Sequence, residues 1–347
     1  MANFALMKSK DMPKKYVLDL TVTSVTALHE RYVLIRLTCD GALPAMLPGQ
    51  FVEVRVDDEP RTFLRRPISI CNVVDNELWL LVAVVGYGTR RLARLRAGAR
   101  LNCVLPLGNG FTLPGKDGAN EANGANGAYG EDEANEAYGA NEAYGANGAC
   151  GANGACGANT KWRAPLLVGG GVGVAPLLFL GKTLREMGVE PTFLLGARTK
   201  RDLLLTDEFG KYGRVFVTTE DGSAGERGFV TNHTLLYNGS PDPYKGSPDP
   251  YKGSSALYNG SPDPYKGSTA LYNWRPDLIQ TCGPTPMMKA VARYARAEGI
   301  ACEASLENMM ACGLGACLCC VEKTTRGNLC VCKDGPVFNT NELLWHD

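Results

Sequence analysis

The chain has 347 residues, which is enough for two or three folded domains. Its 36 lysine and arginine residues balance 36 aspartate and glutamate residues, so no net charge favours nucleic acid or an anionic membrane as a partner. No apolar stretch approaches the roughly 20 residues that span a bilayer, and the first residues lack the apolar core of a signal peptide. Thirteen cysteines, six of them between Cys312 and Cys332, fit a cofactor site in a reducing compartment, so we expect a cytoplasmic protein.

The N-terminal third of the chain alternates apolar and polar residues in short runs. These runs cover residues 16–39, 51–56, 77–85 and 100–107, and turns rich in Gly and Pro separate them. Alternation with a period of two predicts half-buried strands. Closely spaced strands of this kind predict a small antiparallel barrel, with its strands between residues 15 and 114 and a domain covering residues 1–114.

Two segments of low complexity interrupt the chain. Residues 115–161 consist mostly of Gly, Ala, Asn, Glu and Tyr, and residues 238–273 repeat the unit SPDPYKGS. Such compositions bury too little apolar surface to fold, so we predict two disordered surface insertions. Cys150 and Cys156 occupy a repeat position that tyrosine fills elsewhere, and we assign no metal site to them.

Between and after these insertions the pattern changes to strands and helices in alternation. Residues 164–188 combine a buried strand, a glycine turn and an amphipathic helix, and further strands are expected at 191–198 and 214–223. Residues 278–299 repeat the order of strand, turn and helix. This alternation predicts a parallel sheet with covering helices over residues 162–300.

Two short motifs in the predicted barrel favour flavin binding. RRPISI (65–70) places arginine, proline and a hydroxyl on one strand, where they could hold a phosphate and the edge of a flavin ring. Alone, this segment is equally compatible with an edge strand that carries surface arginines. GYGT (86–89) adds backbone N–H groups suited to a pyrophosphate, and the two motifs together predict a flavin site.

The predicted sheet carries two motifs suited to a dinucleotide. GGGVGVAP (169–176) follows a strand and opens a helix, which is the context of a phosphate-binding turn, although Pro176 stands where a third glycine is expected. CGP (282–284) ends a later strand, where parallel sheets present groups that contact ligands. Cys282 could equally be a small buried hydrophobic residue.

The C-terminal segment holds a C-x4-C-x2-C pattern followed by one more cysteine, the plant-ferredoxin spacing of a [2Fe–2S] cluster. The four predicted ligands are Cys312, Cys317, Cys320 and Cys332. A structural zinc ion is the main alternative, but zinc sites usually pair their cysteines in two C-x2-4-C units, so the spacing favours the cluster. Cys319 and Cys330 are spare cysteines that could substitute as ligands, and Cys302 is expected to serve packing.

The order of these motifs resembles the ferredoxin–NAD(P) reductase superfamily. RPIS, GYGT, GGGVGVAP, CGPTPMM, MACGLGAC and VCKDGPVF look most like the electron transfer subunits of class 1B dihydroorotate dehydrogenases, and they are spread over nearly all of the chain outside the insertions. This resemblance implies a multidomain α/β plus β fold. An antiparallel FAD-binding β-barrel would precede a Rossmann-like parallel α/β NAD-binding domain and a small C-terminal [2Fe–2S] domain over residues 301–347.

The resemblance also implies which residues hold the cofactors. For FAD they are Arg66, Pro67, Ile68, Ser69, Leu81, Val82, Ala83, Gly88 and Thr89. The family often has an aromatic residue and an arginine at positions 82 and 83 of this chain, so only backbone contacts carry over there. For NAD, the two sheet motifs themselves point to Gly170, Gly171, Gly173, Cys282, Gly283 and Pro284. The four cysteines carry over as the cluster ligands.

The implied function is an electron relay in pyrimidine biosynthesis. Electrons would pass from the FMN of a separate catalytic subunit through the [2Fe–2S] cluster and FAD to NAD+, in a heterotetramer with two copies of each subunit. The chain shows no dihydroorotate site of its own. Two alternatives are a related ferredoxin- or sulfide-linked NAD(P) reductase subunit and a non-catalytic zinc-binding module. Arg198 could pair with the 2′-phosphate of NADP, whereas the resemblance favours NAD.

Overall fold

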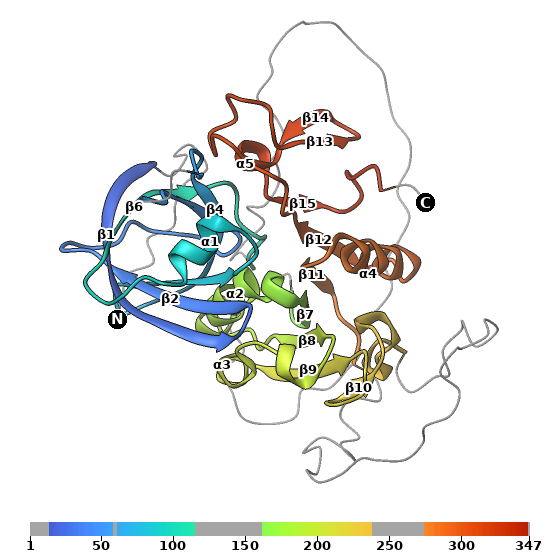
Figure 1. Cartoon of the computed structure of the whole chain (residues 1–347). Helices are drawn as coiled ribbons and strands as arrows, with labels where there is room; N and C mark the ends of the chain where they lie inside the picture. Colours follow the sequence, from blue (N-terminus) through green and yellow to red (C-terminus); the bar gives the residue numbers. More distant parts are fainter. Residues whose placement is uncertain (1–13, 58–60, 115–161, 238–273, 346–347) are drawn as a thin grey trace, which may run out of the picture. The chain divides into compact units, whose positions relative to one another are not determined.

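The structure is a computed structural model that describes residues 14–57, 61–114, 162–237 and 274–345 (Figure 1). The two predicted insertions, with Cys150 and Cys156, lie outside these ranges. Within them, no helix is long and apolar enough to cross a membrane. The barrel, the sheet and the C-terminal segment described below belong to one compact unit.

The N-terminal strands form the predicted closed antiparallel barrel, with the order β1-β2-β5-β4-β3-β6. Its strands are β1 (Tyr16–His29), β2 (Tyr32–Thr38), β3 (Phe51–Val54), β4 (Arg66–Val74), β5 (Glu77–Ala83) and β6 (Arg100–Leu107). The GYGT motif forms the start of a short helix, α1 (Tyr87–Leu92), immediately after β5. The barrel therefore places the RPIS strand beside the strand that leads into α1.

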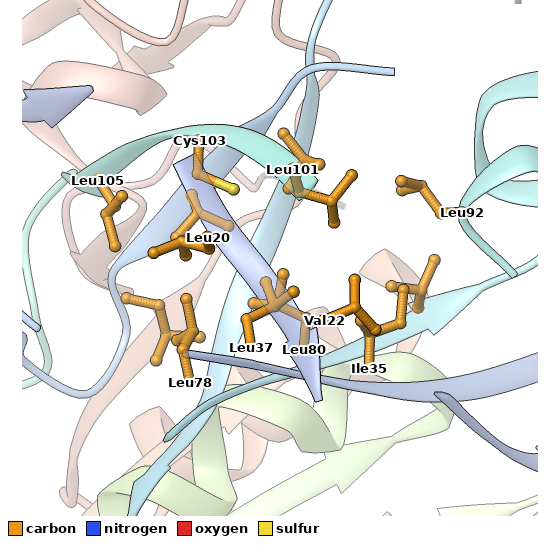
Figure 2. Packing of buried hydrophobic residues seen from close by; sticks show 14 of the residues in the cluster. Leu20, Val22, Ile35, Leu37, Leu78, Leu80, Leu92, Leu101, Cys103 and Leu105 are labelled. Atoms are coloured by element: carbon orange, nitrogen blue, oxygen red, sulfur yellow. The ribbon is translucent and has the colours of Figure 1, made fainter. Parts of the chain in front are cut away.

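Alternate residues of the barrel strands fill its interior, as the period of two predicts (Figure 2). Leu20, Ile35, Leu78 and Leu80 are almost fully buried there, and each such side chain contributes roughly 1.5–3 kcal/mol of transfer free energy. Val82 belongs to the same core. Because successive side chains of a strand point to opposite faces, its neighbours Leu81 and Ala83 face away from the barrel interior.

Seven strands form the second sheet, in the order β10-β9-β8-β7-β11-β12-β15. They are β7 (Pro165–Gly170), β8 (Thr192–Ala197), β9 (Arg214–Thr219), β10 (Glu226–Arg227), β11 (Leu278–Cys282), β12 (Ala301–Ser305) and β15 (Val337–Asn339). All neighbours are parallel except β12 and β15. The predicted Rossmann-like sheet is confirmed, with one antiparallel edge strand added.

Helices and short 3-10 turns connect these strands. The helices are α2 (Ala175–Glu186), α3 (Thr206–Gly210) and α4 (Thr285–Ala297), and the turns are η1 (Gly171–Val174), η2 (Lys200–Asp202), η3 (Val230–Asn232) and η4 (Thr234–Tyr237). The strand β7 is buried along its whole length and runs through η1 directly into α2, with Pro176 in the first turn of that helix. GGGVGVAP thus forms the strand, turn and helix that its sequence predicts.

The C-terminal segment contributes to the sheet and also packs on the barrel. β12 and β15 belong to the sheet, although they come from residues 301–347, so the predicted domain boundaries remain a prediction. Between them lie the hairpin of β13 (Val321–Thr324) and β14 (Gly327–Cys330) and the helical turn α5 (Val331–Asp334). Cys320, Cys332 and Phe338 share one hydrophobic core with Phe51 and Leu107 of the barrel.

Candidate cofactor sites

Cavity 1 lies where the barrel meets the turn η1 and the start of the C-terminal segment. It is lined by Phe51, Arg66, Pro67, Ile68, Ser69, Leu81, Ala83, Val85, Thr89, Val172, Ala175, Leu306, Glu307, Asn308, Met310 and Pro336. Most of these side chains are apolar, with one arginine and one carboxylic acid among them. An apolar lining with few polar groups suits a flat ring system that must be held in one orientation.

The predicted FAD residues converge on this cavity. Seven of them line it, namely Arg66, Pro67, Ile68, Ser69, Leu81, Ala83 and Thr89. Val82 instead points into the barrel core, which agrees with the expectation that only its backbone could contact a ligand. Gly88 supports the cavity from behind, because a Cβ at this position would lie 2.8 Å from Arg66 Nε. A side chain at position 88 would therefore displace the arginine.

Local hydrogen bonds fix the polar groups of cavity 1. The Arg66 guanidinium donates to the carbonyl oxygens of Leu64 at 2.7 Å and Arg65 at 3.2 Å. The Thr89 hydroxyl accepts hydrogen bonds from the backbone N–H groups of Val85 and Gly86. This closes the turn before α1 and holds its first residues against the strand β5. The protein's own hydrogen bonds therefore order both motifs, and their predicted contact with a phosphate remains a prediction.

Sequence reasoning missed the wall of cavity 1 that comes from the C-terminal segment. Leu306, Glu307, Asn308 and Met310 follow the end of β12, and Pro336 precedes β15. The signal in the sequence was weak, because ACEAS is a five-residue run that was not recognised as a strand. The carboxyl ends of parallel strands are nevertheless where ligands bind in such sheets, and β12 follows this rule.

Cavity 2 lies at the carboxyl ends of β7, β8, β9 and β11, and its volume of about 500 Å³ is typical of a small-molecule site. It is lined by Arg31, Tyr32, Gly170, Gly171, Gly196, Ala197, Arg198, Asp202, Thr218, Glu220, Gly228, Phe229, Val230, Thr231, Pro284, Pro286, Met287 and Ala290. The buried Thr218 hydroxyl has no hydrogen-bond partner among the described residues. A ligand with hydrogen-bonding groups, such as a dinucleotide, would provide one.

The predicted NAD residues divide into two groups around cavity 2. Gly170, Gly171 and Pro284 line it. Gly173 and Gly283 lie behind it, where a Cβ at Gly173 would come within 2.4 Å of Gly283 Cα, so both glycines permit a close contact of two backbone segments. Arg198 also lines the cavity, as does Glu220, an acidic residue that sequence analysis did not single out.

Cys282 lies between the two cavities and lines neither. It is fully buried, and this burial, together with the nearby Glu307 carboxylate, raises the pKa of its thiol well above the usual value. Its Sγ lies 4.0 Å from Glu307 Oε1. Cys282 therefore contacts cavity 1 through Glu307, and its predicted part in an NAD site remains a prediction.

The four predicted cluster ligands form two neighbouring pairs. Cys317 is hydrogen-bonded to Cys312, and Cys320 is hydrogen-bonded to Cys332. Among the described residues, no three His, Cys, Asp or Glu side chains converge on a single metal ion. A [2Fe–2S] cluster has two irons that each take two thiolates, so two adjacent pairs fit this cluster better than they fit a single zinc ion.

Backbone N–H groups point at three of the four sulfur atoms. Leu314 donates to Cys312 Sγ at 3.4 Å, Gly315 to Cys332 Sγ at 3.1 Å, and the backbone N–H of Cys332 donates to Cys320 Sγ at 3.3 Å. Such donors stabilise thiolates and cluster sulfur atoms. Gly315 has a φ of 81°, which favours glycine in this loop.

The two cysteine pairs differ in their surroundings. Burial alone would raise the pKa of Cys312, but hydrogen bonds from the backbone of Leu314, from Cys317 and from Ala316 lower it to about 6. Desolvation and the neighbouring Cys320 raise the pKa of Cys332 to about 12. Cys317 is exposed, whereas Cys320 and Cys332 are buried. One pair therefore faces the surface of the loop and the other faces its hydrophobic core.

The spare cysteines lie outside these pairs. Cys319 is exposed, and Cys330 Sγ lies 3.8 Å from the carbonyl oxygen of Gly315, beneath the loop. Cys302 is buried in the core of the sheet, as expected for a packing residue.

A closed antiparallel barrel followed by a Rossmann-like sheet, with a cavity at each, is the fold of ferredoxin reductases. Solved structures agree with this fold. A structure of NADH-dependent reduced ferredoxin–NADP oxidoreductase aligns over 94% of this chain and 90% of its own, with a TM-score of 0.65 and 24% identity. The ferredoxin reductase in carbazole 1,9a-dioxygenase aligns over 84% of this chain and 68% of its own, with a TM-score of 0.52 and 18% identity.

Sequence relatives narrow the class to one family. Residues 307–344 match the iron–sulfur cluster binding domain of dihydroorotate dehydrogenase B. The electron transfer subunit of dihydroorotate dehydrogenase B (NAD(+)) from Lysinibacillus sphaericus is 33% identical over 88% of this chain and 90% of its own length. That of Bacillus velezensis is 31% identical over 93% and 97%. The chain belongs to the family of dihydroorotate dehydrogenase B electron transfer subunits.

Proposed function

We propose that the chain is the electron transfer subunit of an NAD-dependent dihydroorotate dehydrogenase. It holds one FAD and one [2Fe–2S] cluster, takes electrons from the FMN of a catalytic subunit and passes them to NAD+. Family membership supports this function, since the relatives carry this name over nearly their whole length.

The observation that carries the proposal is the continuity of the three sites. Leu306, Glu307, Asn308 and Met310 line cavity 1, and the chain continues from them directly into the first cysteine pair at Cys312. On the other side, Val172 lines cavity 1 while the preceding residue, Gly171, lines cavity 2. The cysteine loop, cavity 1 and cavity 2 are thus connected in the order that an electron relay requires.

The residues of cavity 1 are proposed to hold FAD. Arg66 is the one cation in the described lining, and it suits a phosphate or an electron-rich ring edge, while the backbone of α1 offers N–H groups to the pyrophosphate. When bound, FAD can accept single electrons and donate a hydride, which is the conversion that a one-electron cluster cannot perform. Leu81, Ala83 and Val172 exclude water from this region.

The residues of cavity 2 are proposed to hold NAD. Gly170 and Gly171 let the backbone approach a pyrophosphate at the strand-to-helix turn, and Gly171 has the φ of 57° that favours glycine. The Thr218 hydroxyl, which has no partner in the part of the chain that the structure describes, can bind a ribose or amide group. Glu220 lines the same cavity and suits the free 2′-hydroxyl of NAD, since a carboxylate would repel a 2′-phosphate.

The partner and the assembly complete the proposal. The chain works with an FMN-containing catalytic subunit, in a heterotetramer of two copies of each, and it does not oxidise dihydroorotate alone. The cysteine content fits the cytoplasm, where pyrimidine synthesis supplies the substrate.

The deciding experiment is co-purification of the full chain from its source organism. We expect recovery of an FMN-containing partner, FAD and iron in the ratio of two irons per chain, with dihydroorotate-dependent reduction of NAD+ only in the complex. NADH should bleach the flavin absorbance of the isolated chain, and the reduced cluster should then give an electron paramagnetic resonance signal.

Two results would contradict the proposal. A colourless chain that holds one zinc ion would support the zinc-binding alternative. A complex that reduces NADP from ferredoxin or sulfide, without any dihydroorotate activity, would support a related reductase subunit.

A further inference from the structure

The proposed relay has a proton requirement that the electron path does not meet. Two electrons that leave the cluster one at a time carry no proton. The NADH that leaves cavity 2 carries a hydride, which is two electrons and one proton. One proton per NADH must therefore enter cavity 1, because dihydroorotate releases its own protons in the partner subunit.

Cavity 1 offers a single group suited to this task. Among its described lining residues, Glu307 is the one carboxylic acid and Arg66 the one cation, and there is no His, Lys, Cys or Tyr. The arginine stays protonated throughout the neutral range, and hydroxyl groups such as those of Ser69 and Thr89 do not give up a proton there. The Thr89 hydroxyl is also committed to the backbone before α1.

The position of Glu307 fits the handling of a proton. It follows the end of β12, is exposed to solvent, and lines cavity 1 beside Leu306 and Asn308. The surrounding protein raises the pKa of its carboxyl above the usual value by desolvation. The Cys282 thiol of β11 lies 4.0 Å from its carboxyl group, and Arg66 of β4 lines the same cavity.

We propose that Glu307 is the proton donor and acceptor of the flavin in cavity 1. This inference rests on the proposed function. The Glu307 carboxyl releases one proton to the ring nitrogen of the flavin as the flavin receives two electrons from the cluster. That proton leaves as part of the hydride that reduces NAD+, and the Glu307 carboxylate takes up one proton from solvent. In the reverse direction, Glu307 accepts the proton before the electrons can pass to the cluster.

The experiment uses the reverse direction, because NADH is a convenient reductant. Stopped-flow absorbance separates hydride transfer to the flavin from the later passage of electrons to the cluster. In the E307Q variant, the rate of hydride transfer to the flavin serves as the internal reference, since the hydride brings its own proton. Cluster reduction should be about 10²-fold slower, which is the usual effect of removing a general base, and its solvent isotope effect should change.

A spectroscopic measurement does not depend on rates. Infrared difference spectra of the chain, recorded between oxidised and NADH-reduced states, should show a change in the C=O band of a protonated carboxyl group in wild type. We expect this band to be absent in E307Q. The matched control is E342Q, which removes a carboxylate of the same C-terminal segment that pairs with Arg326 and does not line cavity 1. It should behave as wild type in both measurements.

A second variant separates chemistry from packing. E307D keeps a carboxyl group, so its rate of cluster reduction should be at least tenfold higher than that of E307Q. Equal rates in E307Q and E307D, or a wild-type rate of cluster reduction in E307Q, would overturn the proposal. If E307Q failed to retain FAD, the wild-type infrared difference spectrum would decide instead. A spectrum without any change in a protonated carboxyl band would overturn the proposal. Loss of FAD, cluster or NADH reduction in the wild-type chain would count against the proposed function and not against Glu307.

Discussion

Cavity 1 and cavity 2 share the turn η1, but they are lined by different kinds of residue. Cavity 1 has one cation and one carboxylic acid in a largely apolar lining. Cavity 2 has two of each, Arg31, Arg198, Asp202 and Glu220, near its glycine turn. Both linings are otherwise largely apolar, so the cavities differ in the number of charged groups that they offer to a ligand. The lining with fewer charges suits the proposed FAD, and the lining with more charges suits the proposed NAD.

The largest expected effect concerns the loop that supplies electrons to cavity 1. Cys317→Ser should abolish the [2Fe–2S] cluster, measured by iron content and by the visible spectrum, because serine is a poor iron ligand in this setting. FAD content and flavin reduction by NADH should stay at wild-type levels, since Cys317 is exposed and supports no core. Cys319→Ser is the matched control at an exposed neighbouring position, and it should retain the cluster. Loss of FAD together with the cluster would show that cavity 1 is not separate from the loop.

A smaller effect tests the proposed FAD site in cavity 1. Arg66→Ala should weaken FAD binding by about ten- to a hundredfold, because it removes charge-assisted hydrogen bonds worth roughly 1.5–3 kcal/mol. Titration of the FAD-free chain with FAD, followed by flavin fluorescence, gives the dissociation constant. Arg100→Ala, an exposed barrel arginine that does not line either cavity, should bind FAD normally. If binding of ADP-ribose weakened as much as FAD binding did, the two cavities would not be independent sites.

The next prediction concerns the barrel strand that runs from cavity 1 to the cysteine loop. Glu53 is 1% exposed, and its carboxylate oxygens have no hydrogen-bond partner among the described residues. Burial raises its pKa from 4.5 to about 7, a change that the nearby Arg65 opposes and Cys312 adds to. A carboxyl whose pKa is raised by folding stabilises the folded state fully below pH 4.5 and loses this contribution as the pH rises through 7.

The measurement is the unfolding free energy of the iron-free chain by urea titration between pH 4 and 8. As the pH rises over this range, the unfolding free energy of wild type should fall by up to about 3 kcal/mol relative to that of Glu53→Gln, whose amide does not titrate. The exposed Glu30 supplies the control variant Glu30→Gln, which should follow wild type. Parallel curves for wild type and Glu53→Gln would mean that Glu53 is not desolvated.

The smallest effect belongs to cavity 2. Phe229 is 65% exposed and lines this cavity, so its ring is available to stack on the adenine of a dinucleotide. Phe229→Ala should weaken NADH binding by about 1 kcal/mol, roughly fivefold, and leave FAD content unchanged. Phe63→Ala, an exposed phenylalanine outside both cavities, should change neither quantity. Unchanged NADH affinity in Phe229→Ala would place the adenine elsewhere in the cavity.

The sequence was most informative where structure depends on local pattern. Alternation in VLDLTVTSV and YVLIRLTC predicts β1 and β2, and the strand, turn and helix of GGGVGVAP appear as β7, η1 and α2. The spacing of the cluster cysteines predicts four ligands, and the structure brings those four together in pairs.

It was least informative where distant segments meet. FVEVRV alternates, so Glu53 would be expected on an exposed face, but all four residues of β3 are buried. The reason is that Gly313 of the cysteine loop covers this face, where a Cβ would lie 2.7 Å from Glu53 Cγ. In the same way, Gly173 reads as part of a phosphate-binding turn, whereas its contact with Gly283 can be seen only in three dimensions. No sequence pattern pointed to Glu307, because its proposed role depends on its position in the lining of cavity 1.

The attachment of the C-terminal segment has a consequence for how such chains can be recombined. The backbone N–H of Asn109 donates to the carbonyl oxygen of Gly335 at 2.5 Å, and the Asn109 amide donates to that of Asp334 at 2.7 Å. Pro336 lines cavity 1, and β12 and β15 complete the sheet. The C-terminal segment that carries the cysteines therefore cannot be separated from the barrel and the sheet as an independent domain. A chimera that exchanged it for the segment of another reductase would have to inherit the matching barrel loop as well, or it would lose its flavin along with its iron.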